Sequence, residues 1–162
     1  MNFLETARDL ETQIQHYYQE LADKCADNEG LRYILSELIM DHKQHGSKLQ
    51  LMTDDKCPEL KTSESFHAAL NFFRNLQKEQ ETFSCDIDQA NMYRQAVELI
   101  ERKIEFYEKA ISDLNCADEQ AVITEILKDE KRHKFVLENI IEIVTKPHSW
   151  LENAEFNHLD EF

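Results

Sequence analysis

The chain has 162 residues, which suits one domain with a sizeable core and leaves no room for a second full domain. With only two glycines and two prolines, it lacks the turn residues that an all-β or α/β fold needs, so it favours long helices. The formal net charge of −15 disfavours nucleic acid and anionic membrane surfaces as partners, because like charges repel.

The four cysteines are far apart in the sequence: Cys25, Cys57, Cys85 and Cys116. Without a C-x-x-C pair they predict reduced thiols in a cytosolic protein, not a zinc or rubredoxin-type iron site. No apolar run reaches the roughly 18 residues of a transmembrane span. The first residues also lack the basic end and apolar stretch of a signal peptide. We therefore expect a soluble cytoplasmic protein.

The first half of the chain predicts two long helices. Apolar residues recur there at alternating steps of three and four, the pattern of a helix that buries one side. The first stripe runs from Leu4 to Cys25 and passes through position 11. The second runs from Leu31 to Met52 and passes through positions 42 and 45.

The second half predicts one short and two long helices. Residues 53–62 have no apolar period and precede a shorter amphipathic helix. Its apolar side carries Phe66, Leu70, Phe73 and Leu76. A third long stripe consists of Tyr93, Val97, Ile100, Ile104, Tyr107, Ile111 and Leu114. A fourth runs from Ile123 to Val144, passes through positions 130 and 133, and ends before Pro147, which cannot continue a helix.

The connections indicate how these helices are arranged. Only a few residues join the first helix to the second and the third to the fourth, so each pair should pack as an antiparallel hairpin. A long crossover that contains the short helix joins the hairpins, which is the ferritin-like connection. We expect an all-α, ferritin-like four-helix bundle over residues 1–146. The tail, residues 147–162, is expected to dock as a short helix or to mediate assembly.

Polar residues interrupt three of the stripes at positions that the period assigns to the core. They are Glu11, His42, His45, Glu130 and His133. Each pair on the second and fourth helices is spaced three apart, so both side chains project from one side of the helix. Buried carboxylates and imidazoles are normally paired or bound to metal. Their mixture suits iron, manganese or zinc, and the alternative is a polar core cluster without metal.

With these motifs the chain resembles the rubrerythrin-like branch of the ferritin-like superfamily, without a rubredoxin segment. In that family the first helix carries a ligand Glu followed by an aromatic pair, here LETQIQHYYQEL. The second and fourth helices carry E-x-x-H, matched in part by DHKQH and in full by DEKRH. The third repeats the Glu-to-aromatic pattern in IERKIEFY, with Glu101. The resemblance implies a di-iron site that reacts with oxygen or peroxide.

Two positions depart from the family pattern. His42 stands where the family has a bridging glutamate, and imidazole cannot bridge two metals as a carboxylate does. In the third helix the stripe places Ile100 at the ligand depth, with Glu101 one residue around the helix on a face that otherwise reads as solvated. A π-bulge would turn Glu101 inward. Without it the pattern favours one metal or an asymmetric pair, with Asp41 as a substitute carboxylate.

Two tyrosines are candidates for a catalytic role. Tyr18 and Tyr107 lie on their stripes about two turns from the metal layer. A phenol at this depth could donate a hydrogen bond or carry an electron, and the alternative is simple packing in the bundle core.

The leading interpretation is a non-haem di-iron oxidoreductase, a rubrerythrin-like peroxidase or ferroxidase that reduces peroxide or oxygen with electrons from a separate donor protein. Its candidate ligands are Glu11, His42, His45, Glu101, Glu130 and His133. Two alternatives are an iron storage or delivery protein without turnover and a structural bundle with a degenerate site. Manganese or zinc could replace iron, and the resemblance also implies a homodimer.

Overall fold

A computed structural model describes residues 3–24, 28–53, 64–84 and 87–152. Over these ranges the chain forms helices and no strands, which confirms the predicted all-α class. The helices are α1 Phe3–Lys24, α2 Glu29–Thr53, α3 Ser65–Glu79, α4 Ile87–Asp113, α5 Ala117–Thr145 and α6 Pro147–Glu152. None of the described helices is long and apolar enough to cross a bilayer.

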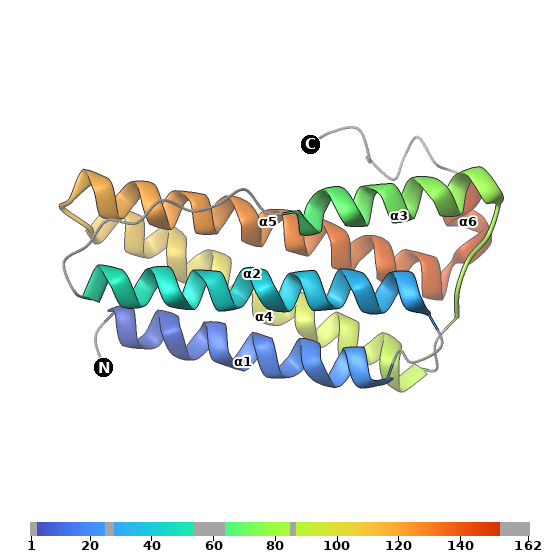
Figure 1. Ribbon diagram of the computed structural model, residues 1–162, viewed down its shortest axis with the longest axis horizontal. Coiled ribbons are helices and arrows are strands. Elements are labelled where there is room, and N and C mark those ends of the chain that lie inside the picture. Colours follow the sequence, from blue (N-terminus) through green and yellow to red (C-terminus); the bar gives the residue numbers. More distant parts are fainter. Residues whose placement is uncertain (1–2, 25–27, 54–63, 85–86, 153–162) are drawn as a thin grey trace.

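Two antiparallel hairpins make up the bundle (Figure 1). Helix α1 packs along α2, and α4 packs along α5. The hairpins then meet through contacts of α1 with α4 and of α2 with α5, while α3 lies against α2 and α5. This is the predicted ferritin-like arrangement, in which the segment between the hairpins includes a shorter helix.

The second helix begins with a side-chain cap. The Asn28 carboxamide oxygen accepts a hydrogen bond from the Leu31 backbone N–H at 2.8 Å, which satisfies one of the free N–H groups at the helix start. This cap therefore marks the start of α2.

The stripes of α1, α2 and α5 are buried over most of their predicted length, and α4 differs in part. Leu4 and Val144, at the ends of two of these stripes, are half-buried, and Cys25 lies outside the described residues. The described core of α4 contains Tyr93, Ala96, Ile100, Lys103, Tyr107 and Ala110. The predicted Val97, Ile104 and Ile111 lie half-buried at its edges. Both stripes share the residues at 93, 100 and 107, and they differ only in whether a step of three or of four comes first. The small side chains of Ala96 and Ala110 let α4 approach its neighbours closely on the observed side.

A polar layer divides the core into two apolar clusters. In α1 the layer lies between Ala7 of one cluster and Ile14 of the other. Helices α2 and α5 show the same order. The cluster of Ala7 also contains Leu49 and Leu127, and the cluster of Ile14 also contains Ile39 and Val136. The interrupting polar residues therefore meet at a common depth, enclosed by apolar packing at both ends.

Helix α6 docks on the end of the bundle formed by α3 and α5. The Trp150 side chain is 1% exposed and meets the Phe73 ring edge to face at 6.0 Å between centroids. Its indole N–H donates to the Asn139 carboxamide oxygen at 3.0 Å. The buried indole therefore satisfies its one donor while filling the end of the core.

Replacing Trp150 with alanine should lower the free energy of unfolding by about 3 kcal/mol, because a large cavity forms and the Asn139 carboxamide loses its partner. Urea unfolding followed by circular dichroism measures this difference. The matched control is His148→Ala, which changes an exposed residue of the same helix and should alter stability by less than about 0.5 kcal/mol. Equal stability of the two variants would contradict the docking of α6.

Candidate metal centre

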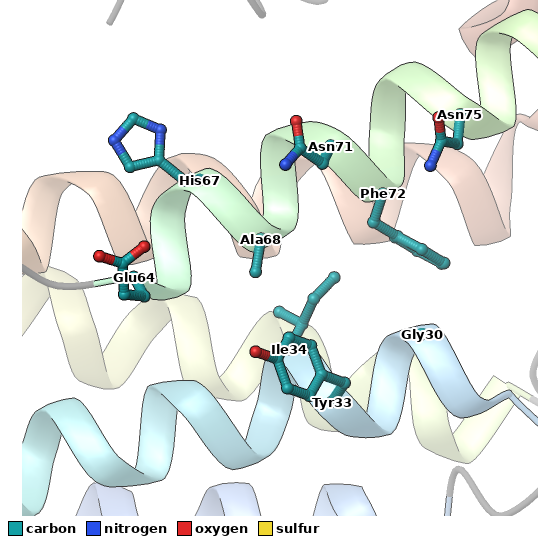
Figure 2. Close-up of a pocket in the computed structure, with 9 residues that line it drawn as sticks. All are labelled: Gly30, Tyr33, Ile34, Glu64, His67, Ala68, Asn71, Phe72 and Asn75. Atoms are coloured by element: carbon teal, nitrogen blue, oxygen red, sulfur yellow. The ribbon is translucent and has the colours of Figure 1, made fainter.

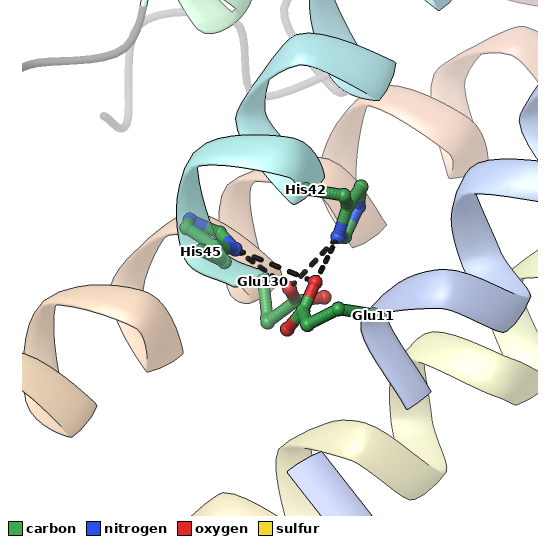
Figure 3. A group of neighbouring side chains, drawn as sticks. All are labelled: Glu11, His42, His45 and Glu130. Atoms are coloured by element: carbon green, nitrogen blue, oxygen red, sulfur yellow. Dashed lines mark hydrogen bonds and ion pairs between the residues drawn. The ribbon is translucent and has the colours of Figure 1, made fainter. Parts of the chain in front are cut away.

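Two carboxylates and two imidazoles converge inside the bundle (Figure 3). Glu11 comes from α1, His42 and His45 from α2, and Glu130 from α5, and all four are 0% exposed. One ligand atom from each residue can be chosen so that all of them lie within 4.8 Å of one another. Among the described residues this is the one group of histidine, cysteine and acidic side chains with such spacing.

The two histidines of α2 face the two carboxylates. His42 Nδ1 lies 2.6 Å from Glu11 Oε2 and 3.6 Å from Glu130 Oε1. His45 Nδ1 lies 3.7 Å from the same Glu11 oxygen and 3.5 Å from the same Glu130 oxygen. The spacing of three residues on α2 thus directs both rings to one pair of oxygens, as the sequence pattern predicts.

A buried lysine that the sequence reasoning did not identify completes the cluster. Lys103 of α4 is 1% exposed, and its Nζ lies 3.0 Å from Glu11 Oε2, 2.8 Å from Glu130 Oε1 and 3.1 Å from His42 Nδ1. The signal for it was present, since a step of three from Ile100 and of four to Tyr107 passes through Lys103.

Aspartates outside the cluster hold two of the histidines by their second ring nitrogen. His45 Nε2 lies 2.9 Å from Asp129 Oδ2, and His133 Nε2 lies 2.9 Å from Asp41 Oδ2. Asp41 is also hydrogen-bonded by the Ser65 hydroxyl. A carboxylate on one nitrogen fixes the orientation of the ring, a common arrangement around metal-binding histidines, and in His45 it leaves Nδ1 to face the site. Asp41 therefore supports His133 and does not take the predicted place of a substitute ligand.

His133 and Glu101 are placed differently from the four clustered residues. The His133 ring lies 4.9 Å from the His42 ring between centroids, beside the group but outside it. Glu101 is exposed, and its Oε1 lies 3.4 Å from Lys134 Nζ on the surface. Helix α4 continues as a regular α-helix through this region, so no π-bulge turns Glu101 inward, and Ile100 faces the core.

The two candidate tyrosines are both buried near the cluster. The Tyr107 hydroxyl donates to Glu11 Oε1 at 2.6 Å, closer to the site than the predicted two turns. The Tyr18 ring lies 5.3 Å from the His42 ring between centroids. Burial and the nearby carboxylates raise the pKa of both phenols well above the ordinary value, so both keep their protons at neutral pH.

The carboxylates are held in their charged form. Burial acts to raise the pKa of Glu130, but the charges of Lys103 and His42 outweigh it and lower the pKa to about 2. Burial opposes ionisation of Glu11 in the same way, and the same two neighbours hold its pKa well below the ordinary value. Without the Lys103 ammonium, the core would enclose two negative charges that lack their strongest partner.

The two histidines of α2 are shifted in opposite directions. Burial and the Lys103 charge lower the pKa of His42 to about 4, so this ring is neutral at pH 7. Burial also acts to lower the pKa of His45, but the hydrogen bond to Asp129 and the nearby carboxylates of Glu11 and Glu130 outweigh it and raise the pKa well above its ordinary value. A neutral imidazole is the form that binds metal, so His42 is already in that form, whereas His45 must lose a proton.

Several buried atoms around the cluster have no hydrogen-bond partner within the described part of the chain. They are Tyr18 Oη, His42 Nε2, His45 Nδ1, Glu130 Oε2 and His133 Nδ1. Buried polar atoms are rarely left without a partner, since each costs about 1–3 kcal/mol. The two carboxylates and two imidazoles of Glu11, His42, His45 and Glu130 form a donor set that fits a single transition-metal ion.

A separate cavity of about 500 Å³ lies between α2 and α3. Figure 2 shows Tyr33, Ile34 and Phe72 in the space between the two helices, whereas His67 points away from α2. Glu64 is the acidic residue of its lining. This open cavity lacks the convergence of ligating groups seen in the bundle core.

The metal-free protein, kept in EDTA, should be most stable near pH 6.5. Below this pH the unfolded chain protonates His42 with its ordinary pKa of 6.5, whereas the folded chain resists protonation until about pH 4. The free energy of unfolding should therefore fall by roughly 3 kcal/mol over this interval. The pKa of Glu130 is 4.5 in the unfolded chain and about 2 in the folded chain, so protonation of Glu130 lowers the free energy of unfolding further below pH 4.5.

Above pH 6.5 the free energy of unfolding should fall as the pH rises. The folded chain keeps a proton on His45 that the unfolded chain releases, so stability falls as the pH rises through the folded pKa. Urea unfolding at stepped pH measures both slopes. His42→Gln should flatten the slope between pH 6.5 and 4 and leave the alkaline slope in place. An unchanged acid slope in this variant would refute the assignment to His42.

Comparison with known proteins supplies the family. The sequence matches the rubrerythrin family over residues 2–141, which includes every residue of the buried cluster. Searches of curated proteins and of solved structures found no match. The match covers most of the chain, and it agrees with both the hairpin arrangement and the E-x-x-H motif of α5. The chain therefore belongs to the rubrerythrin family.

Proposed function

We propose that the protein is a non-haem iron oxidoreductase that holds one iron ion in the buried cluster and reduces peroxide or oxygen. The observation that carries this proposal is the convergence of Glu11, His42, His45 and Glu130 in the core of a rubrerythrin-family bundle. The family typically binds iron, and this donor set suits iron.

The number of ions follows from the positions of the other candidate ligands. Glu101 lies on the surface, and Ile100 takes the inward position in α4. His42 stands where a bridging carboxylate would be needed, and its imidazole cannot bridge two metals in that way. A second ion would thus lack the carboxylates that the family pattern provides at these two positions, so we propose a single-ion site and not the di-iron pair.

Each residue of the site has a defined part in this proposal. Glu11, Glu130 and the α2 histidines bind the ion, and Asp129 orients the His45 ring. Tyr107 orients Glu11 through its 2.6 Å hydrogen bond and holds a proton at Oη next to the cluster. A bound iron ion supplies one-electron chemistry between its ferrous and ferric states.

The reaction also requires a partner. Reduction of one peroxide to two waters consumes two electrons and two protons. The four cysteines of the sequence include no C-x-x-C pair that could hold a rubredoxin-type iron, and we propose that a separate electron-donor protein supplies the electrons. The apolar packing on both sides of the polar layer keeps bulk water away from the ligands, which strengthens their electrostatic interactions.

Anaerobic loading with ferrous iron should give about one bound iron per chain. Adding peroxide should then develop a near-ultraviolet ferric absorption, with turnover when a reductant is present. Glu130→Gln removes one ligating charge and should weaken iron binding by about 10-fold or more. Metal analysis and stopped-flow absorption measure the two effects.

The matched control is Glu101→Gln, which makes the same chemical change at an exposed glutamate. This variant should bind iron and react with peroxide as the unaltered protein does. Bound iron without any peroxide response would refute the redox proposal and favour iron delivery. Equal loss in the two glutamine variants would refute the assignment of the ligands.

A further inference from the structure

Lys103 is the one cation of α4 that the bundle encloses within its described core. Lysine is almost never fully buried unless it is paired. Here the ammonium contacts one oxygen of Glu11 and one of Glu130, and it lies next to His42 Nδ1. These three atoms belong to three of the four residues of the candidate metal site.

We propose that Lys103 is an internal counter-cation that competes with a metal ion for the cluster. Its ammonium neutralises the carboxylates in the metal-free bundle, and a metal binds only when the ammonium withdraws. The inference rests on the metal site of the proposed function, but it does not depend on any redox activity there.

The distances make the two cations mutually exclusive. Zinc binds carboxylate oxygen and imidazole nitrogen at about 2.0–2.2 Å. Because Lys103 Nζ already lies 3.0, 2.8 and 3.1 Å from Glu11 Oε2, Glu130 Oε1 and His42 Nδ1, an ion bound to these atoms would touch the ammonium. Two cations in contact repel strongly in a buried, weakly screening environment.

The Lys103 ammonium is a counter-charge for the two buried carboxylates. Two buried carboxylates face the Lys103 ammonium and the His45 ring, whose outer nitrogen is paired with Asp129. The Lys103 ammonium thus offsets part of the negative charge of the two carboxylates. A metal ion that entered while Lys103 stayed in place would lie against this ammonium and be repelled by it.

A small cavity beside Lys103 offers space for its side chain to move away from the carboxylates. Lys103 lines a small cavity of about 50 Å³ between α1 and α4, together with Leu10, Gln13, Ile14, Leu99 and Arg102. A lysine has a flexible four-carbon stem. The stem can stay against the apolar lining while the ammonium moves from the carboxylates toward the polar Gln13 side of this cavity.

The competition can be measured with zinc, which has no redox chemistry. Lys103→Met keeps an unbranched side chain but lacks the terminal ammonium, so it should bind zinc at least tenfold more tightly than the unaltered protein. In EDTA it should melt at a lower temperature, and zinc should raise that temperature more than in the unaltered chain. Lys134→Met is the control, since Lys134 pairs with exposed Glu101 and Glu138 on the surface, and it should behave as the unaltered protein does.

A second measurement does not require a folded methionine variant. Labelling lysine with ¹³C at Cε in the unaltered protein gives a Lys103 signal that is assigned by its loss in Lys103→Arg. Saturating zinc should shift this signal more than that of any other lysine, at one zinc per chain. Equal zinc affinities for Lys103→Met and the unaltered protein, or a Lys103 signal that bound zinc leaves in place, would overturn the proposal.

The two proposals fail in different ways. A protein that binds zinc against Lys103 but shows no peroxide response after iron loading would refute the redox function and leave the competition standing. A protein that turns over peroxide although Lys103→Met leaves its zinc affinity unchanged would keep the function and refute the role of Lys103.

Discussion

The burial of two carboxylates at one depth of the bundle is the constraint on which the rest of the structure depends. Glu11 and Glu130 are both 0% exposed, and uncompensated charges in such surroundings would cost several kcal/mol each. The fold meets this demand from different helices. Helix α4 provides the Lys103 ammonium, α2 provides two imidazoles, and the Tyr107 hydroxyl donates to Glu11. The site is therefore best described as two anions that require cationic or hydrogen-bonding partners.

The two hairpins contribute to this site in a related but unequal way. An aspartate stands directly before the first ligand position of α2 and of α5, and each reaches across to a histidine of the other helix. The two bonds have the same length and the same ring nitrogen. The symmetry does not extend to the other two long helices, because α1 provides Glu11 whereas α4 provides Lys103, one turn after Ile100. The two hairpins therefore differ in charge at this depth, with an anion from α1 and a cation from α4.

Much of the fold could be predicted from the sequence because burial in a bundle follows the apolar period. The stripes of α1, α2 and α5 carry their polar interruptions at fixed steps, and those interruptions proved to be buried. Helix α4 was ambiguous because two stripes share Tyr93, Ile100 and Tyr107, and local pattern alone cannot choose between them. The larger apolar residues favoured Val97 and Ile104, whereas close packing selected the side with alanine and Lys103. The partner of a buried lysine depends on contacts between distant helices, which no local spacing reveals.

The bonds between aspartate and histidine also couple the site to the docking of the two hairpins. Asp129 and Glu130 belong to the second hairpin, whereas His45 and Glu11 belong to the first, so neither hairpin alone can assemble the cluster. A ligand of the complete cluster stabilises only the state in which the hairpins are joined. Partial opening that separates α1 and α2 from α4 and α5 would then become rarer as the site is filled. Protection of the core amides from hydrogen exchange is thus linked to occupancy of the bundle interior.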